Sequence, residues 1–166
     1  MAKSAMNWIA PCILLITLSA LLLPVQARAL SCPATNADKI AVIDTLRTFY
    51  ALASEDNIPG MHALTSPNFY AFDGGQSFAS PDSLMKNIQS YRDKGFKFVW
   101  SVTDPHVTVR CGDAWIRYVN LGSVQAPGQA PEPYKWLESA VLEKHSGRWK
   151  IVFFQSTPVP PAASAK

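Results

Sequence analysis

The stretch YKWLESAVLEKHSGRWKIVFFQ, residues 134–155, contains two strands and the turn between them. Aromatic and β-branched residues are frequent on both sides of the polar segment His145-Ser-Gly-Arg148, which is typical of a hairpin. The segment before it, residues 125–133, contains three prolines and a glycine, and this composition favours a loop over a tight turn.

Further strands precede this hairpin. Residues 96–103 alternate apolar and polar side chains, and residues 106–110 and 114–124 continue the strand pattern. Asp104-Pro105 interrupts the series, so we expect a bend or a bulge there, because proline cannot donate to a neighbouring strand. Cys111-Gly-Asp113 predicts a turn.

Helices are predicted upstream of these strands. Residues 37–53 place apolar side chains at three- and four-residue spacing, with Thr35 or Asn36 as the N-cap, and residues 59–64 fit one or two helical turns. Residues 65–68 read as a turn, and residues 69–73 as a short aromatic strand that Gly74-Gly75 closes. Ser80-Pro-Asp82 is a helix start, and that helix ends near Gly95.

This order of elements predicts an α+β domain. We expect three N-terminal helices to pack on one face of a strongly curved antiparallel or mixed sheet. A bent sheet that wraps over helices makes a cone with an internal cavity, and such cavities hold small ligands.

The N-terminal segment has the layout of a secretory signal. Residues 4–27 carry no charge, Lys3 and Arg28 flank them, Pro24 follows the apolar run, and Ala27-Arg-Ala29 provides the small residues of a cleavage site. We therefore predict cleavage after Ala29 and a periplasmic or secreted protein. The alternative is an uncleaved membrane anchor, because the uncharged stretch is long enough to span a bilayer.

Cleavage changes the charge and the cysteine count. Removing 29 of the 166 residues leaves 137, and the removed Lys3 and Arg28 leave 13 basic against 12 acidic residues. Lysine and arginine are not clustered, so neither nucleic acid nor, after cleavage, a membrane is a predicted partner. The two remaining cysteines, Cys32 and Cys111, predict one disulfide that stabilises the fold by about 4 kcal/mol.

The remaining composition predicts neither a metal site nor a cofactor. The three histidines are scattered and do not form a ligand pattern with the cysteines. The proline-rich residues 158–166 are predicted to be a disordered tail, which leaves residues 30–157 as one domain.

Several motifs resemble those of one protein superfamily. They are residues 49–56 (FYALASED), 64–70 (LTSPNFY), 72–75 (FDGG), and the hairpin 142–152 (LEKHSGRWKIV) with 154–157 (FQST) behind it. In this order they resemble the nuclear-transport-factor-2-like superfamily, specifically its SnoaL-like and ketosteroid-isomerase-like members. The superfamily contains isomerases, dehydratases, cyclases and non-catalytic binding modules, so the resemblance implies a fold and leaves the activity open.

Two acids are the candidate catalytic residues. Asp73 occupies the place that the resemblance gives to the general base of the isomerases, and a carboxylate beside an apolar cavity is suited to moving a proton next to a carbonyl. The alternative is that Asp73 only bonds the backbone of its Gly-Gly turn. Glu138 matches the acid that donates to the substrate oxygen, or it is an exposed glutamate paired with Lys135 or Arg117.

The sequence also departs from the isomerase pattern. Thr48 stands where the resemblance places a tyrosine of the oxyanion hole, and Tyr50 is expected on a different side of the helix. A missing donor of this kind costs about a hundredfold in rate. The aromatic residues expected to line the cavity are Tyr50, Trp100, Tyr118 and Trp136.

Three functions follow from these observations. The first is a binding module for a small apolar molecule, which the aromatic residues and the near-neutral charge favour. The second is a cofactor-free isomerase or lyase with Asp73 as the base. The third is a non-catalytic interaction module that forms a homodimer through its open sheet face.

Overall fold

The computed structural model describes residue 32 and residues 34–159, so the predicted signal sequence and most of the predicted tail lie outside the described residues. The elements in chain order are α1 (Asn36–Ser54), α2 (Ile58–Leu64), β1 (Thr65–Asp73), β2 (Gln76–Phe78), α3 (Pro81–Arg92), β3 (Lys97–Val99), β4 (Val102–Arg110), β5 (Asp113–Gln125), β6 (Glu132–His145) and β7 (Arg148–Pro158). Within this part of the chain, no helix has the length and apolar character needed to cross a membrane.

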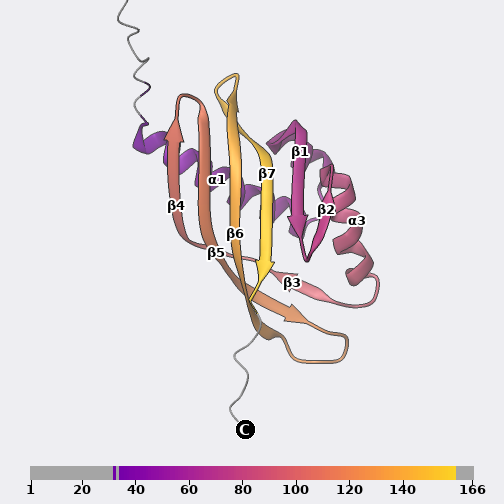
Figure 1. Cartoon of the computed structure of the whole chain (residues 1–166). Helices are drawn as coiled ribbons and strands as arrows, with labels where there is room; N and C mark the ends of the chain where they lie inside the picture. Colours follow the sequence, from indigo (N-terminus) through magenta and orange to yellow (C-terminus); the bar gives the residue numbers. More distant parts are fainter. Residues whose placement is uncertain (1–31, 33, 160–166) are drawn as a thin grey trace, which may run out of the picture. The chain divides into compact units, whose positions relative to one another are not determined.

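The strands form one strongly curled mixed sheet. Six of its seven strands follow the order β2-β1-β7-β6-β5-β3, and the seventh, β4, pairs with β5. The pair β1–β7 is parallel and the other pairs are antiparallel. Helix α1 runs across one face of the sheet and contacts β4, β5 and β7, whereas α3 lies beside β1 and β2 (Figure 1). The predicted α+β class and the three helices are confirmed.

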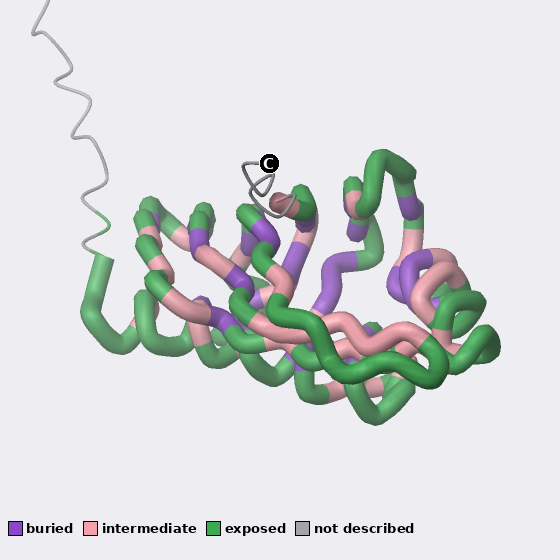
Figure 2. The backbone as a smooth tube through the Cα atoms, turned by 90° about the horizontal axis from the view of Figure 1, so that it is seen from below, coloured by how far each residue is buried: buried purple, intermediate pink, exposed green. Residues whose placement is uncertain are grey.

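The core lies between α1 and the inner face of the sheet. On α1, the buried side chains recur at three- and four-residue spacing and are Val42, Leu46, Phe49, Tyr50 and Ala53. Burying an aliphatic or aromatic side chain of this size stabilises the fold by about 1.5–3 kcal/mol. Figure 2 shows the buried segments spread in short stretches along helices and strands, while most of the turns between them are exposed.

Local hydrogen bonds cap the N-termini of the two longer helices, α1 and α3. The Thr35 hydroxyl accepts from the backbone N–H of Asp38 at 3.0 Å, and the Asp38 carboxylate accepts from the Thr35 hydroxyl at 2.7 Å. Lys144, at the end of β6, donates to the same carboxylate at 2.6 Å. Ser80 caps α3 in the same manner by accepting from the N–H of Ser83 at 3.1 Å.

A sharp change of partner on β5 bends the sheet. Up to Asn120 this strand pairs with β4, and from Ser123 it pairs with β3. Between them a Cβ on Gly122 would lie 1.8 Å from the carbonyl oxygen of Val99, so only glycine permits this close approach of two backbones. The Asn120 side chain holds the bend, because its oxygen accepts from the N–H of Ser101 at 2.8 Å.

The structure corrects several predicted boundaries. Residues 65–68 belong to β1, although its pairing with β7 is irregular between Thr65 and Tyr70. Residues 96–103 are not one strand, since the bend at β5 separates β3 from β4. The predicted bulge at Asp104 is confirmed by a register shift between Thr103 and His106. Pro158, assigned to the tail, ends β7 opposite Trp136, because a strand's last residue does not need the N–H that proline lacks.

The predicted disulfide joins Cys32 to Cys111. Their Cα atoms lie 4.9 Å apart, and 79 residues separate them in sequence. The bond fastens the segment that precedes α1 to the turn between β4 and β5. A loop of this length corresponds to about 4.5 kcal/mol on the chain-entropy scale.

Candidate functional site

A cavity of about 280 Å³ lies between α1, α3 and the inner face of the sheet. Nine of its 21 lining residues are aromatic, among them Tyr50, Tyr91, Phe98, Trp100, Tyr134 and Trp136. An engineered protein cavity of about 150 Å³ holds benzene, so this volume corresponds to a molecule of about eleven non-hydrogen atoms.

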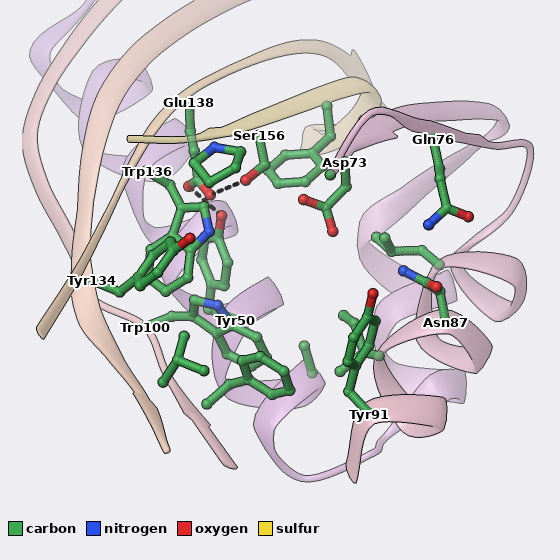
Figure 3. A pocket seen from close by; sticks show the side chains of 18 of the residues that line it. Tyr50, Asp73, Gln76, Asn87, Tyr91, Trp100, Tyr134, Trp136, Glu138 and Ser156 are labelled. Carbon is green, nitrogen blue, oxygen red and sulfur yellow. Dashed lines mark hydrogen bonds between the residues drawn. The ribbon is translucent and has the colours of Figure 1, made fainter. Parts of the chain in front are cut away.

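Both predicted acids line this cavity. Figure 3 shows the carboxyl group of Asp73 turned toward the hollow, across from Asn87 and Tyr91 of α3, with Glu138 on the neighbouring wall. Among the residues that line the cavity, these two carboxyl groups are the only charged side chains. The hollow therefore combines an aromatic wall with two acids and no base.

Strand register places the acids in one row across the sheet. Asp73 on β1 is opposite Ser156 on β7, Ser156 is opposite Glu138 on β6, and Glu138 is opposite Tyr118 on β5. Neighbouring strands are about 4.8 Å apart, so the Cα atoms of the two acids are separated by about 10 Å. The two acids therefore lie on the same inner face of the sheet, two strands apart.

Glu138 is held by three hydrogen-bond donors. Its side chain is buried, and it accepts from the hydroxyl of Tyr50, from the amide of Asn120 at 3.2 Å and from the hydroxyl of Ser156 at 2.9 Å. The Tyr50 hydroxyl also lies 3.2 Å from that of Tyr118. The structure thus excludes an exposed glutamate paired with Lys135 or Arg117.

Opposing effects set the protonation of Glu138. Burial raises its pKa above the ordinary value for a glutamate, because the charged form loses its hydration. Hydrogen bonds from Tyr50, Ser156 and Asn120 act in the other direction by stabilising the carboxylate. The net pKa is raised, so Glu138 keeps its proton to a higher pH than an exposed glutamate does.

Asp73 lies at the end of β1 and is half-buried. Burial raises its pKa, while a hydrogen bond from Ser156 and one from the backbone N–H of Gly74 lower it. Gly74 and Gly75 both have positive φ, 57° and 78°, so glycines make the turn that directs the carboxyl group inward. Asp73 therefore bonds the backbone of its glycine turn and also lines the cavity.

Ser156 connects the two acids. Its hydroxyl lies between them and has one proton to donate. When Glu138 is ionised, Ser156 donates to it. When Glu138 carries a proton on the same oxygen, the Ser156 oxygen can accept a hydrogen bond from it, and the Ser156 hydroxyl donates to Asp73 instead. The protonation states of the two carboxyl groups are therefore linked through one hydroxyl.

Comparisons with known proteins place this arrangement in a family. A family model described as a SnoaL-like domain matches residues 42–160. The chain belongs to the SnoaL-like domain family. No curated protein is similar enough to count as a match.

Solved structures share the fold of this SnoaL-like domain. A ketosteroid isomerase-like protein from Erwinia carotovora atroseptica has a TM-score of 0.62 at 14% identity, covering 76% of this chain and 100% of that one. A Nostoc punctiforme protein with a cystatin-like fold has a TM-score of 0.62 at 12% identity, covering 78% and 96%. The CaMKII hub of S. rosetta has a TM-score of 0.61 at 18% identity, covering 76% and 99%. At these identities the likeness shows the fold alone.

The structure corrects the expectation for Tyr50 and Thr48. Tyr50 reaches the acid from α1, because it lies on the buried face of that helix next to Phe49. Thr48 is exposed, and its hydroxyl donates to the carbonyl of Asp44 at 2.8 Å. The SnoaL-like domain therefore has a tyrosine hydroxyl at Glu138, although two residues later than the isomerase pattern implies.

Three of the four aromatic residues predicted to line the cavity do so. Tyr50, Trp100 and Trp136 line the cavity, whereas Tyr118 lies beyond the Tyr50 hydroxyl and does not line it. Burial raises the pKa of both tyrosines well above the ordinary value, so both remain neutral donors at physiological pH.

Sequence reasoning missed Asn120 and Ser156. Asn120 is completely buried in β5, where its amide links the bend of the sheet to Glu138. A lone asparagine or serine in a strand carries no motif. The signal that could have found them is register, since Ser156 and Glu138 are paired on neighbouring strands of the closing hairpin.

Proposed function

We propose that this SnoaL-like domain binds a small, mostly apolar molecule in the cavity between α1, α3 and the sheet. The observation that carries the proposal is the hollow of about 280 Å³, with an aromatic lining and its polar groups gathered at the row Glu138, Ser156 and Asp73. Binding sites for small molecules combine an apolar lining with a few converging polar groups in this way.

A cavity-filling variant tests this proposal. Ile88 of α3 lines the hollow, and Ile88→Trp places an indole in it. Ile40→Trp is the matched control, because Ile40 is exposed on α1. Small molecules are extracted from each purified protein and identified by mass spectrometry. A molecule that accompanies the parent chain and the control, and is lost from Ile88→Trp, supports the proposal. Equal recovery from all three proteins contradicts it.

A second candidate function is proton transfer without a cofactor. It is favoured by the row that joins Asp73 to Glu138 through Ser156. Asp73 as carboxylate would remove a proton from the carbon next to a carbonyl, and Glu138 in its protonated form would donate to the carbonyl oxygen. Two carboxyl groups with different environments are suited to these two roles.

Proton exchange tests this second candidate without knowledge of the substrate. Small cyclic ketones are incubated with the protein in D₂O, and loss of the proton signal next to the carbonyl is followed by NMR. Catalysed exchange that Asp73→Asn abolishes, at an unchanged melting temperature, supports the base role. Exchange at the same rate in Asp73→Asn, or none above buffer with any ketone, contradicts it.

The outer face of the sheet favours self-association as well. A row of side chains crosses β1, β7, β6 and β5 on that face: Tyr70, Phe153, Val141 and Trp115. Trp115 is 46% exposed and Leu137 on the same face is 51% exposed. We propose that two copies bury this face together as a homodimer, which exposed apolar patches of this kind favour. Trp115→Lys would then give a monomer in sedimentation, and an unchanged mass contradicts the proposal.

We also propose that the chain is exported, to the periplasm or outside the cell. The uncharged N-terminal stretch with its small-residue site, and a disulfide at the start of the domain, support this localisation. The mass of the protein recovered from its native host tests it. A chain that begins at Leu30 is expected, and a full-length chain in the cytoplasm contradicts the proposal.

A further inference from the structure

The charge of the cavity suggests the chemistry of its ligand. The two carboxyl groups of Asp73 and Glu138 line the hollow, and no lysine, arginine or histidine among the described residues does so. Arg92 and Lys94 each lie near one aromatic ring of the wall and do not line the cavity. The Arg92 guanidinium lies 6.0 Å from the Trp100 ring centroid but is bound to Asp56, and the Lys94 amine lies 5.5 Å from the Tyr91 ring centroid.

The aromatic rings provide a second attraction for a positively charged ligand. Trp100 stacks on Phe98 with centroids 5.6 Å apart, and Tyr134 and Trp136 of β6 have centroids 4.7 Å apart. On the opposite side, the Tyr91 ring faces the hollow from α3 (Figure 3). The faces of aromatic rings attract cations, by about 2 kcal/mol or more in sites shielded from water.

Together these features disfavour a negatively charged ligand. A carboxylate or phosphate in the hollow would face two acids with no lysine, arginine or histidine in the lining to offset them, and it would meet the negative face of the Tyr91 ring. A cation meets attraction from both the acids and the rings. The charge of the lining therefore favours a cation over an anion as the ligand.

We infer that the ligand of this cavity is a small organic cation, a protonated or quaternary amine whose apolar body is about the size of one ring. The inference rests on the proposed binding function and names its ligand class. The ammonium group lies against Asp73 and the row of acids, and the apolar body lies between Tyr91 and Trp100.

The protonation of Asp73 and Glu138 should make the affinity for a cation depend on pH. Burial raises the pKa of both acids. The other titratable groups around them are the hydroxyls of Tyr50 and Tyr118, which contact Glu138, and those of Tyr91 and Tyr134 in the cavity wall. A bound cation stabilises the carboxylates and lowers their pKa, so by linkage its affinity rises with pH as the empty site loses its protons. A neutral ketone accepts from a protonated acid, and its affinity falls over the same range.

Benzyltrimethylammonium is a suitable probe, because it has eleven non-hydrogen atoms and its charge does not titrate. Its neutral control is neopentylbenzene, which has the same shape, and its anionic control is phenylacetate. Binding to the purified chain is measured by calorimetry at pH 4.5 and pH 7.5. We expect the cation to bind at least about tenfold more tightly than neopentylbenzene at pH 7.5, and more tightly than at pH 4.5.

Two variants locate the effect. Asp73→Asn is expected to weaken cation binding by about tenfold and to leave neopentylbenzene unaffected. Asp113→Asn is the matched control, because it removes the same charge from the exposed start of β5, away from the cavity. Thermal unfolding shows whether each variant is folded. If Asp73→Asn does not fold, the comparison of probes and pH values on the parent chain still decides the question.

The outcomes separate the two proposals. Neopentylbenzene or phenylacetate binding as tightly as the cation overturns the ligand class and leaves a binding cavity in place. Cation affinity that falls with rising pH, or that Asp113→Asn reduces as much as Asp73→Asn, also overturns it. If no probe binds and no small molecule accompanies the purified chain, both the ligand class and the binding function are contradicted.

Discussion

Tyr50→Phe tests the buried network around Glu138. The substitution removes one hydroxyl and keeps the ring that packs between Phe49 and Trp100. That hydroxyl donates to the Glu138 carboxyl group and lies 3.2 Å from the Tyr118 hydroxyl. The variant therefore removes one donor from a buried acid, and the Tyr118 hydroxyl keeps its hydrogen bond to Glu138.

The expected loss follows from these contacts. A hydrogen bond to a charged group contributes about 1.5–3 kcal/mol, so we expect the free energy of unfolding to fall by about 2.5 kcal/mol at pH 7. With an m-value of about 1.5 kcal/mol per molar urea, the midpoint falls by about 1.7 M. As the pH falls and Glu138 becomes protonated in both proteins, the difference should shrink to about 1 kcal/mol.

The assay is urea unfolding of both proteins at pH 7 and at pH 4. Tyr91→Phe is the matched control, because Tyr91 also lines the cavity and is 41% exposed. It should change the free energy of unfolding by less than about 0.5 kcal/mol. Equal effects of Tyr50→Phe and Tyr91→Phe, or an effect of Tyr50→Phe that does not depend on pH, would refute the reasoning.

Three further changes test other parts of the structure. Cys111→Ser opens a loop that spans a sequence separation of 79 and should lower the free energy of unfolding by about 4.5 kcal/mol, measured in urea without reductant. Gly122→Ala forces a Cβ against the Val99 carbonyl and should cost at least about 2 kcal/mol, with altered near-ultraviolet circular dichroism from the cavity wall. Asp38→Asn removes the partner of Lys144. Hydrogen bonds from Lys144 and Thr35 lower the pKa of Asp38 to about 2, so its stabilising effect is present above pH 3.8 and is lost as the pH falls toward 2. The difference between parent and Asp38→Asn in urea should therefore shrink as the pH falls below 3.8 and disappear below pH 2.

Controls separate these effects from general damage. The parent chain in reductant should match Cys111→Ser, and an equal midpoint with and without reductant contradicts the disulfide prediction. Ser123→Ala next to the glycine should be nearly neutral, and similar losses at both positions contradict the steric argument. Asp44→Asn removes a partner of an exposed pair, Arg47–Asp44 at 3.5 Å, and should change the free energy of unfolding by less than about 0.5 kcal/mol at pH 7.

Much of the fold could be predicted because local patterns agree with the tertiary structure. The spacing of apolar residues on α1, the Ser80-Pro81 start of α3 and the turn at His145-Ser-Gly-Arg148 each have one favourable local structure, and packing does not override it. The bulge at Asp104 also follows from its proline neighbour.

Other elements depend on contacts that no local pattern records. Residues 65–68 look like a turn, yet β7 provides partners for Thr65 and the chain remains extended. The break between β3 and β4 arises because two backbones meet at Gly122, and alternation alone continues through it.

The candidate site was predictable only in part. Asp73 followed from a family resemblance and a glycine turn. Glu138 stayed ambiguous because both faces of its strand are apolar enough to be buried, and the side that faces α1 is set by packing. The inner position of Tyr50 depends on the rotation of α1 against the sheet, which helical spacing approximates to within one residue.

The central claim is that a hollow with two acids in its wall receives a small molecule. The most direct test is a crystal structure of the protein soaked with benzyltrimethylammonium. The account predicts density for the probe between Tyr91 and Trp100, with its ammonium group facing Asp73. A hollow that side chains such as Trp100 and Trp136 fill, or a probe bound only outside it, would contradict the account.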